Sequence, residues 1–561
     1  MKEEKILLLL LPFWDPQIPP SGISCLKAFL REHGYRVKTA DANIEDNLKE
    51  IYHRYFDTLK TYVPPEKRGN FYKTGFDILR NHMMAHLHHG QEREDDYIEL
   101  IKLLVHSVFF ISIDAERVSA LDRMVNEFYE RLKVYVLGLL AAETPGVLGI
   151  SVYSDTLPAS LFAFRLAKAT YPGIRTIMGG GIFASDLAPG TPNMAYLLEN
   201  APYIDQLLVG EGEHLFLDYL ENRLPEAQRV VTLGDIDHKT LDLAEAPIPD
   251  FSDLELVHYP YLTVYTSRSC PFQCKFCAET VHWGKFRKKS ADRVVEELTA
   301  LYRAHGTQLF LMSDSLLNPV VTELSRRLVE EDISIYWDGY LRADAPAGDT
   351  ENTRLWRQGG FYRARLGMES GSRRVLDLMN KNTTVERMKA AVSGLAHAGI
   401  KTTTYWVVGF PGETEPDFQE TLDFLEEMAD DIFEADCSPF WYFRDAQDGD
   451  SQWKNNSVLL YPESMKDMLV MQTWVVDCEP RREEIYRRMW RFVEHCKKLG
   501  IPNPYSLRDF HEADLRWGEL HKNAVPPMVS FGHGKYIDEN KHIKEWVPAQ
   551  KTMADNGDFG F

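Results

Sequence analysis

Cysteine is scarce in this chain, and long apolar runs and an excess of basic side chains are absent. Only 7 of 561 residues are cysteine, an odd number without paired spacings, which excludes a disulfide framework and predicts a cytoplasmic protein. The formal net charge of −21 excludes the basic surface that contacts phosphates, so we expect no nucleic-acid partner. No apolar run reaches the roughly 18 residues of a membrane span, so we expect no membrane partner.

The composition is that of a globular protein with several domains. At 561 residues, of which 44% are hydrophobic, the chain exceeds what one hydrophobic core usually serves. We predict an α/β protein with four parts. These are a Rossmann-like domain at 1–225 with a helical insertion at about 45–145, a linker at 226–258, a partial barrel at 259–443, and a mostly helical, loop-rich domain at 444–561.

The first part alternates strands and helices. The pattern begins with an apolar run from Lys5 to Leu11, followed by an amphipathic segment through Glu32 and a second short strand. It resumes near 147, and together these segments predict a five-strand parallel sheet. The first turn lacks Gly-x-Gly-x-x-Gly, which argues against NAD. The insertion carries the histidine-rich stretch "NHMMAHLHHG". No carboxylate helper accompanies these histidines, so we interpret them as a partly exposed helix end rather than a metal site.

The third part repeats a strand and a helix six times. Six successive units of this kind predict a parallel partial barrel, a (β/α)6 fold, whose chemistry gathers at the carboxyl ends of the strands. The strand candidates are residues 262–269, 308–314, 333–341, 362–369, 401–410 and 432–443.

Three of the cysteines follow the first of these strands, in "SRSCPFQCKFCAET". The spacing of Cys270, Cys274 and Cys277 provides three thiolates on one loop. A structural zinc site needs four ligands, usually as two pairs, and no second pair stands nearby. A [4Fe-4S] cluster on three cysteines instead leaves one iron open for an outside ligand.

The triplet, with Phe276 before its last cysteine, resembles the signature of the radical S-adenosylmethionine (SAM) superfamily. The resemblance implies a [4Fe-4S] cluster held by the three cysteines, SAM bound to the open iron, and cleavage of SAM to a 5'-deoxyadenosyl radical. It also implies which residues contact SAM. The candidates are Phe276, Ser313 and Asp314 after the second strand, Arg342 after the third, Glu369 and Ser370 after the fourth, and Val408 and Gly409 after the fifth.

The order of an αβ domain, a linker and such a barrel is similar to that of the cobalamin-binding members of the superfamily, called class B when they methylate. The resemblance implies a corrin at the carboxyl edge of the first sheet. The motif Asp-x-His-x-x-Gly is absent from the chain, so base-off cobalamin without that histidine ligand is expected. The cobalamin candidates are Pro19, Pro20, Ser21, Ser151, Ser154, Gly179, Gly180, Gly181, Gly210 and Glu211.

By this resemblance the chain is expected to be a C-methyltransferase of the EC 2.1.1 type. It would transfer a methyl group from SAM, via methylcobalamin, to an unactivated carbon of a peptide side chain or a natural product. No catalytic residue on the substrate side can be assigned, but Trp441, Tyr442 and Arg444 are candidates for holding the substrate. We expect a monomer that receives electrons from a flavodoxin- or ferredoxin-type donor.

Two other functions stay open. The same two cofactors could support cyclisation or rearrangement without methyl transfer, which would leave S-adenosylhomocysteine absent. A non-catalytic corrin or iron-sulfur sensor is the alternative of another class, and it would need an effector- or DNA-binding module that the acidic C-terminal region does not suggest.

Overall fold

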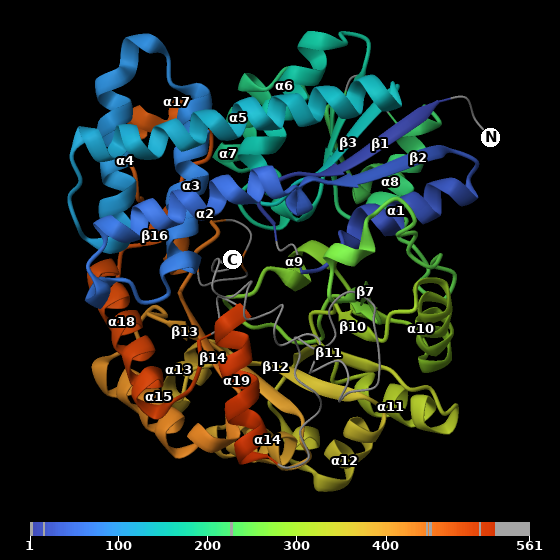
Figure 1. Cartoon of the computed structure of the whole chain (residues 1–561), viewed down its shortest axis with the longest axis vertical. Coiled ribbons are helices and arrows are strands. Elements are labelled where there is room, and N and C mark those ends of the chain that lie inside the picture. The colour runs from blue at the N-terminus through green and yellow to red at the C-terminus, as the bar shows by residue number, and fades with distance from the viewer. Residues whose placement is uncertain are drawn as a thin grey trace.

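The computed structural model describes residues 4–521 apart from 15–16, 225–227, 445–446, 448–450 and 504–506. Residues 522–561 of the predicted C-terminal domain therefore lie outside the described residues. Two parallel sheets organise the chain, one in the N-terminal half and one in the C-terminal half, and they lie above and below each other in Figure 1.

The N-terminal sheet has six strands in the order β2-β1-β3-β4-β5-β6, and every neighbouring pair is parallel. The expectation of five strands is wrong, because β6 lies in the predicted linker and its three residues are too few to show a periodic pattern. The strands are β1 (Lys5–Leu10), β2 (Arg36–Asp41), β3 (Val147–Ser151), β4 (Arg175–Gly179), β5 (Gln206–Val209) and β6 (Val230–Thr232). The helices of this half are α1 (Ser21–Glu32), α6 (Leu157–Thr170), α7 (Pro192–Asn200) and α8 (Gly212–Leu220).

Strand β1 shows why the sheet is buried on both faces. Its residues from Ile6 onward are all buried, and they alternate between two hydrophobic clusters on opposite sides of the sheet. A near-continuous apolar strand of this kind belongs at the centre of a parallel sheet. A Cβ on Gly149 of β3 would lie 2.7 Å from the Leu8 side chain, so the absence of a side chain there lets the two strands pair closely.

The insertion is helical, as expected, and packs against the same core. It consists of α2 (Asp46–Tyr62), α3 (Phe71–His88), α4 (Glu94–Phe109) and α5 (Ala115–Glu143). Most of the apolar side chains of these helices belong to the large cluster that also covers the N-terminal sheet. The insertion is therefore a continuation of the first domain's core.

The expectation of an exposed histidine-rich helix end fails for His82. This side chain is fully buried, and its two ring nitrogens lie 2.9 Å from the Tyr55 hydroxyl and 3.0 Å from the Tyr97 hydroxyl. Burial lowers the pKa of His82. Asp122, from α5, lies 2.7 Å from His86. The histidines of α3 thus join α2, α4 and α5 in a polar network that sequence spacing could not reveal.

The second sheet forms the predicted partial barrel. Its strand order is β14-β13-β12-β11-β10-β7, in which chain order and spatial order agree. The strands are β7 (Leu262–Val264), β10 (Leu309–Met312), β11 (Tyr336–Leu341), β12 (Phe361–Glu369), β13 (Lys401–Val408) and β14 (Glu434–Pro439). The helices between them are α10 (Ala291–His305), α11 (Val321–Glu330), α12 (Thr350–Gln358), α13 (Arg373–Leu378), α14 (Val385–His397) and α15 (Glu415–Glu427).

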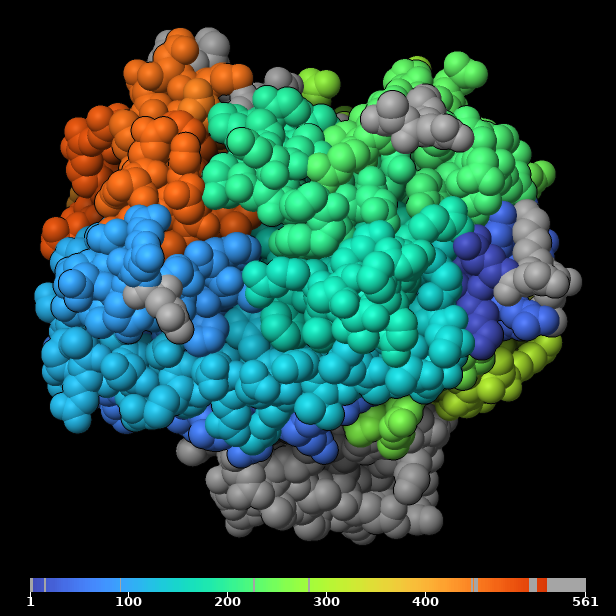
Figure 2. Space-filling model, turned by 90° about the horizontal axis from the view of Figure 1, so that it is seen from above, coloured from blue at the N-terminus to red at the C-terminus, as the bar shows by residue number. Residues whose placement is uncertain are grey.

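The C-terminal segment bridges the two halves. It contains α16 (Ser451–Asn455), β15 (Ser457–Leu459), α17 (Lys466–Leu469), β16 (Trp474–Val476), α18 (Arg482–Leu499) and α19 (Leu507–Leu520). Its surface adjoins that of the insertion (Figure 2), and Arg482 donates a hydrogen bond to the backbone oxygen of Ser107 in α4 at 2.8 Å. None of the described helices combines the length and the apolar composition needed to cross a membrane.

Candidate functional site

The segment that contains the cysteine loop, residues 270–277, begins and ends at a short antiparallel ladder. Strand β8 (Ser267–Arg268) pairs with β9 (Arg287–Lys288), so the two ends of the segment lie side by side. Ser269, directly before the first cysteine, has a φ of 71°, which few non-glycine residues adopt. Its hydroxyl donates to the backbone oxygen of Gly284 at 2.7 Å. The base of the loop is therefore closed by its own hydrogen bonds.

The far side of the loop is held by the turn that follows α13. The backbone nitrogen of Lys275 donates to the oxygen of Met379 at 3.0 Å, and the Asn380 amide donates to the oxygen of Gln273 at 2.7 Å. The loop also continues into the short helix α9 (Glu279–Trp283). The protein thus holds the loop from three directions.

All three loop cysteines are free thiols and partly exposed. Burial raises the pKa of Cys270, and it raises the pKa of Cys277 to about 12. A thiol in this state becomes a ligand when a metal ion displaces its proton. No set of three His, Cys, Asp or Glu side chains among the described residues is arranged to hold one metal ion. An iron-sulfur cluster does not require three ligands to converge on one ion, because each cysteine binds a different iron of the cluster.

Arg342 supplies positive charge beside the cysteines. It follows β11, its side chain is buried, and its Nη1 lies 4.0 Å from the Cys274 sulfur. The guanidinium also lies over the ring of Phe272, 4.1 Å from its centroid. Its Nη2 is buried and has no hydrogen-bond partner among the described residues. A buried, unsatisfied guanidinium nitrogen on a side chain beside the Cys274 thiol fits an anionic cluster and a carboxylate ligand on it.

A second cation lies on the other side of the loop. Lys381 is 2.7 Å from the Glu369 carboxylate, and its ammonium is 5.6 Å from the centroid of the Phe276 ring. Glu369 ends β12 with a φ of 66°. A non-glycine residue in this region is strained, and such strain concentrates at functional sites. Lys381 therefore connects the Glu369 carboxylate to the Phe276 ring of the cysteine loop.

Asp314, a candidate for binding SAM, forms its hydrogen bonds within the protein. Its buried carboxylate accepts hydrogen bonds from the Thr266 backbone nitrogen at 2.9 Å, the Thr266 hydroxyl at 2.8 Å and the Ser267 hydroxyl at 2.5 Å. Burial raises its pKa, and these hydrogen bonds oppose the rise. Ser313 donates through its backbone nitrogen to Val264 at 2.9 Å. Both residues thus fasten the strand end that leads to the cysteine loop.

The other SAM candidates lie at the ends of β12 and β13. Ser370 is fully buried, and its hydroxyl accepts from the backbone nitrogen of Ser372 at 3.1 Å. Val408 is buried at the end of β13. The backbone nitrogen of Gly409 donates to the Glu413 carboxylate at 2.9 Å, and a Cβ on Gly409 would lie 2.4 Å from Ile485 of α18. The structure thus brings the barrel candidates to one mouth, around the cysteines.

The cobalamin candidates lie at the carboxyl edge of the N-terminal sheet, on the side that faces the barrel. The oxygen of Pro19 accepts from the Thr263 hydroxyl of β7 at 3.3 Å, and Pro20 and Ser21 begin α1. Ser151 ends β3. Ser154 donates to the Asp186 carboxylate.

Several of these candidates already have partners in the protein. A Cβ on Gly180, whose φ is 111°, would lie 2.5 Å from both the nitrogen and the oxygen of Val152, so glycine is needed there by the neighbouring backbone. On Gly181 it would lie 2.8 Å from the Tyr153 ring, and on Gly210 2.9 Å from Leu233. By contrast, a Cβ on Gly179 would meet no atom closer than 4.0 Å. Open backbone at Gly179, beside the hydroxyl of Ser151, fits a bulky ligand.

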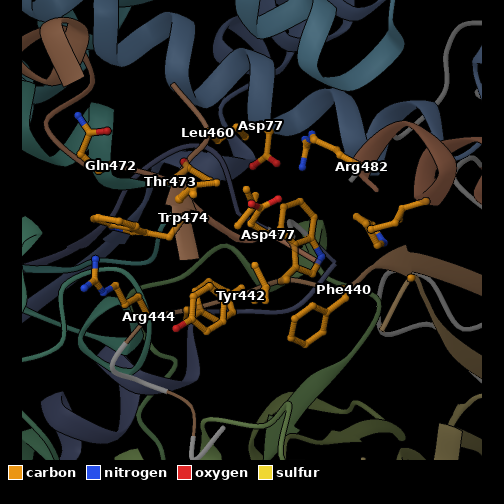
Figure 3. A pocket seen from close by; sticks show the side chains of 18 of the residues that line it. Asp77, Phe440, Tyr442, Arg444, Leu460, Gln472, Thr473, Trp474, Asp477 and Arg482 are labelled. Carbon is orange, nitrogen blue, oxygen red and sulfur yellow. The ribbon is translucent and has the colours of Figure 1, made fainter. Parts of the chain in front are cut away.

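A cavity of about 230 Å³ opens between the two halves near the barrel mouth. Its walls combine aromatic side chains with charged ones (Figure 3). The substrate-side candidates Trp441, Tyr442 and Arg444 line it, and the Arg444 guanidinium lies 4.0 Å from the centroid of the Trp474 ring. We call this cavity the chamber. Its other lining residues include Asp77, Arg80, Asp186, Gly409, Phe440, Gln472, Trp474, Asp477 and Arg482.

The chamber adjoins the cysteine loop through a small hydrophobic cluster. Phe276 packs in this cluster with Phe410, Phe440, Tyr442 and Val476. Three of these side chains also belong to residues that line the chamber. The loop that would carry the metal cluster therefore touches the wall of the chamber.

Carboxylates gather at the insertion side of the chamber. Asp77 forms an ion pair with Arg80 at 3.0 Å, and Asp155 lies 4.0 Å from the same arginine. Partial burial raises the pKa of Asp155 to about 7, because Arg80 offsets only part of the effect and the charges of Asp77 and Asp186 add to it. Sequence reasoning missed Asp77, Arg80, Trp474 and Asp477. Their distances along the chain gave no signal that they would meet.

The parallel half-barrel carries three cysteines on the loop after its first strand. The family model described as the radical SAM superfamily matches residues 264–425, a segment that includes this loop. By its overall fold the chain is similar to TsrM, a radical SAM methyltransferase from Kitasatospora setae solved with cobalamin and a [4Fe-4S] cluster. The TM-score is 0.56 at 14% identity, over 98% of this chain and 100% of that one.

Curated relatives match at low identity. An anaerobic magnesium-protoporphyrin IX monomethyl ester cyclase of Rubrivivax gelatinosus is 26% identical over 58% of this chain and 61% of its own length. The cobalamin-dependent radical SAM methyltransferase TokK of Streptomyces tokunonensis is 23% identical over 50% of this chain and 45% of its own. The chain thus spans less than two thirds of each of these relatives.

Proposed function

We propose that this protein is a cobalamin-dependent radical SAM C-methyltransferase that acts on an unactivated carbon of a small molecule or a peptide side chain. The observation that carries the proposal is the contact between the cysteine loop and the chamber through Phe276. A substrate in the chamber would lie next to the place where SAM is cleaved. Proximity of this kind is what a short-lived radical requires.

Each part of the chain has a role in this proposal. Cys270, Cys274 and Cys277 would hold a [4Fe-4S] cluster, and the free Nη2 of Arg342 would bind the carboxylate of SAM. Ser151 and Gly179 would contact cobalamin at the sheet edge. When bound, the cluster supplies an electron for SAM cleavage and cobalamin supplies the methyl group. We propose that the domain limits predicted from the sequence separate the part that binds cobalamin from the part that binds the cluster and SAM.

The chamber suggests the size of the group that is modified. A cavity of about 230 Å³ lies below the roughly 300–1,000 Å³ that is usual for small-molecule pockets. That space accepts a ring or one side chain and not a folded segment of protein. Aromatic walls with a few polar groups are typical of small-molecule sites. An electron donor of the flavodoxin or ferredoxin type would reduce the cluster in the cytoplasm.

A second function has a specific observation in its favour. The relative from Rubrivivax gelatinosus is named a cyclase, so ring formation without methyl transfer is the competing proposal. The two functions use the same radical and differ in the fate of the second SAM. Only the methyltransferase produces S-adenosylhomocysteine in an amount that depends on cobalamin.

An anaerobic assay tests both proposals. Protein loaded with cobalamin and a reconstituted cluster receives SAM and dithionite, and mass spectrometry follows the products. Formation of both 5'-deoxyadenosine and S-adenosylhomocysteine, with the second lost when cobalamin is omitted, supports the methyltransferase. Formation of 5'-deoxyadenosine alone supports the cyclase. Neither product from protein with a full iron content would contradict both.

The chamber is tested by binding of candidate substrates to two variants. Trp474→Ala removes an aromatic wall, and the exposed Tyr171→Ala is its matched control. We expect weaker binding of a substrate only in the first variant. Equal affinity in both would place the substrate elsewhere.

A further inference from the structure

Arg268 connects the cysteine loop to the other half of the molecule. It lies in β8, two residues before Cys270. Its Nη1 donates to Glu211 at 2.6 Å and its Nη2 to Glu213 at 2.6 Å. Glu211 and Glu213 stand at the start of α8, directly after β5. One guanidinium therefore spans from the barrel to the carboxyl edge of the N-terminal sheet.

The other end of the cysteine segment reaches one of these carboxylates, that of Glu211. Arg287 of β9 is the ladder partner of Arg268, and it forms an ion pair with Glu211. It also donates to the backbone oxygen of Leu241 at 3.0 Å. Both strands that close the cysteine segment thus contact Glu211, and β8 also contacts Glu213. We call Arg268, Arg287, Glu211 and Glu213 the interdomain clamp.

The clamp is shielded from water. The side chains of Arg268, Glu211 and Glu213 are 10%, 3% and 8% exposed. Burial alone would raise the pKa of Glu213, but the Arg268 charge outweighs it and the pKa lies below its usual value. The guanidinium also lies 4.8 Å from the ring centroid of Tyr265 and 5.5 Å from that of Trp283. A buried pair is costly to break, because removal of one partner leaves the other charge desolvated.

The geometry of the clamp fits positioning better than binding of a cofactor. Glu211 was predicted from the sequence to contact cobalamin, yet its carboxylate lies against two arginines. Arg268 is fixed by two carboxylates, so it is not free to bind SAM. A planar fork held by two acids sets orientation as well as distance, which the point charge of a lysine cannot do.

We propose that the interdomain clamp fixes the cysteine loop relative to the carboxyl edge of the N-terminal sheet, and that Arg268 is its positioning residue. On the proposed function, SAM at the loop must line up with cobalamin at the edge. Misplacement of reacting groups by about 1 Å can cost roughly 100-fold in rate. The clamp would thus govern methyl transfer from SAM to cobalamin. Cleavage of SAM at the cluster, which takes place within the barrel, would not depend on it.

The test compares Arg268→Lys and Arg268→Gln with Arg326→Gln, which removes an arginine of an exposed helix pair. The first readout is hydrogen exchange of residues 267–288 in the full chain without added cofactors. We expect exchange there to become about 10-fold faster in both Arg268 variants, with β13 unchanged, because the loop opens when its anchor is lost. Unchanged exchange would overturn the clamp.

The second readout uses reconstituted enzyme with SAM, cobalamin and dithionite. We expect both Arg268 variants to have the iron content of the native protein. The ratio of S-adenosylhomocysteine to 5'-deoxyadenosine should be about 10-fold lower in both. Arg268→Lys should not restore it, because lysine keeps the positive charge but lacks the planar, forked guanidinium. Faster exchange with an unchanged ratio would reduce the clamp to a structural role and overturn the positioning proposal. A native protein that makes no S-adenosylhomocysteine would refute the proposed function, and hydrogen exchange would still decide whether the clamp holds the loop.

Discussion

The barrel mouth and the edge of the N-terminal sheet face each other, but they use their polar residues differently. At the mouth, Arg342 has a buried nitrogen without a partner among the described residues. At the edge, Glu211 is paired with two arginines, and Gly180 is needed by the backbone of Val152. The Arg342 nitrogen at the mouth is therefore available to a ligand, whereas Glu211 and Gly180 at the edge stabilise the protein itself.

The largest expected effect concerns the cysteines. Cys274→Ala should reduce iron content to about three quarters or less and lower 5'-deoxyadenosine formation more than roughly 100-fold, because each cysteine binds its own iron. Iron analysis and electron paramagnetic resonance of the reduced protein measure the cluster. Cys478→Ser, a partly exposed cysteine in the chamber wall, is the control and should keep its full cluster. A full iron content in Cys274→Ala would contradict the proposal that Cys274 binds the cluster at the barrel mouth.

Arg342 should give the next largest effect. Arg342→Ala is expected to lower kcat/KM for SAM roughly 30- to 100-fold, because it removes a charged hydrogen bond to the ligand. Arg342→Lys should recover part of the loss. The measurement is 5'-deoxyadenosine formation at varied SAM concentration, normalised to iron content. If Glu211→Gln weakened SAM binding as much as Arg342→Ala, the contrast between mouth and edge would disappear.

The glycines of the edge provide a stability test. Gly180→Ala should destabilise the fold by about 3 kcal/mol, because the new Cβ meets the Val152 backbone and the φ is unfavourable for alanine. Gly179→Ala is the matched control, since its Cβ has open space, and it should change stability little. Chemical denaturation of the cofactor-free protein measures both. Equal stability of the two variants would show that Gly180 is not required by packing.

The smallest effect is a pH dependence at the chamber. The pKa of Asp155 is raised from 3.8 to about 7 in the folded protein, so the folded state holds its proton more tightly than the unfolded chain. Stability from this group is then present below pH 3.8 and is lost as pH rises through 7. Asp155→Asn should stabilise the protein at pH 8 by at most about 1 kcal/mol, since 42% of the side chain is open to solvent and screened.

The measurement for Asp155 is a denaturation series at pH 5 and pH 8. The gain from Asn should be larger at pH 8 than at pH 5. A gain that is equal at both values would mean that the carboxyl group titrates normally. Tyr171→Ala controls for the general pH dependence of the fold.

Much of the barrel could be predicted, because its strands follow one another in space in the order of the chain. The cysteines follow β7, and the carboxyl ends of parallel barrel strands share one edge, so the ends of β11, β12 and β13 are expected at the same edge as the cysteines. The predictions failed where the contacts of a segment come from distant parts of the chain, or where an element is too short to show a pattern. His82 looked exposed in sequence and is buried by Tyr55 and Tyr97, and β6 was too short to show a period.

The amino-acid sequence by itself determined the two parallel sheets, the helical insertion and the cysteine loop, because apolar periodicity and ligand spacing are local properties. Only the tertiary structure decided the chamber and the clamp. Asp77, Trp474 and Asp477 meet across some 400 residues of chain, and Glu211 meets Arg268 across two domains. Contacts of this kind follow from how whole elements pack, and no short stretch of sequence contains them.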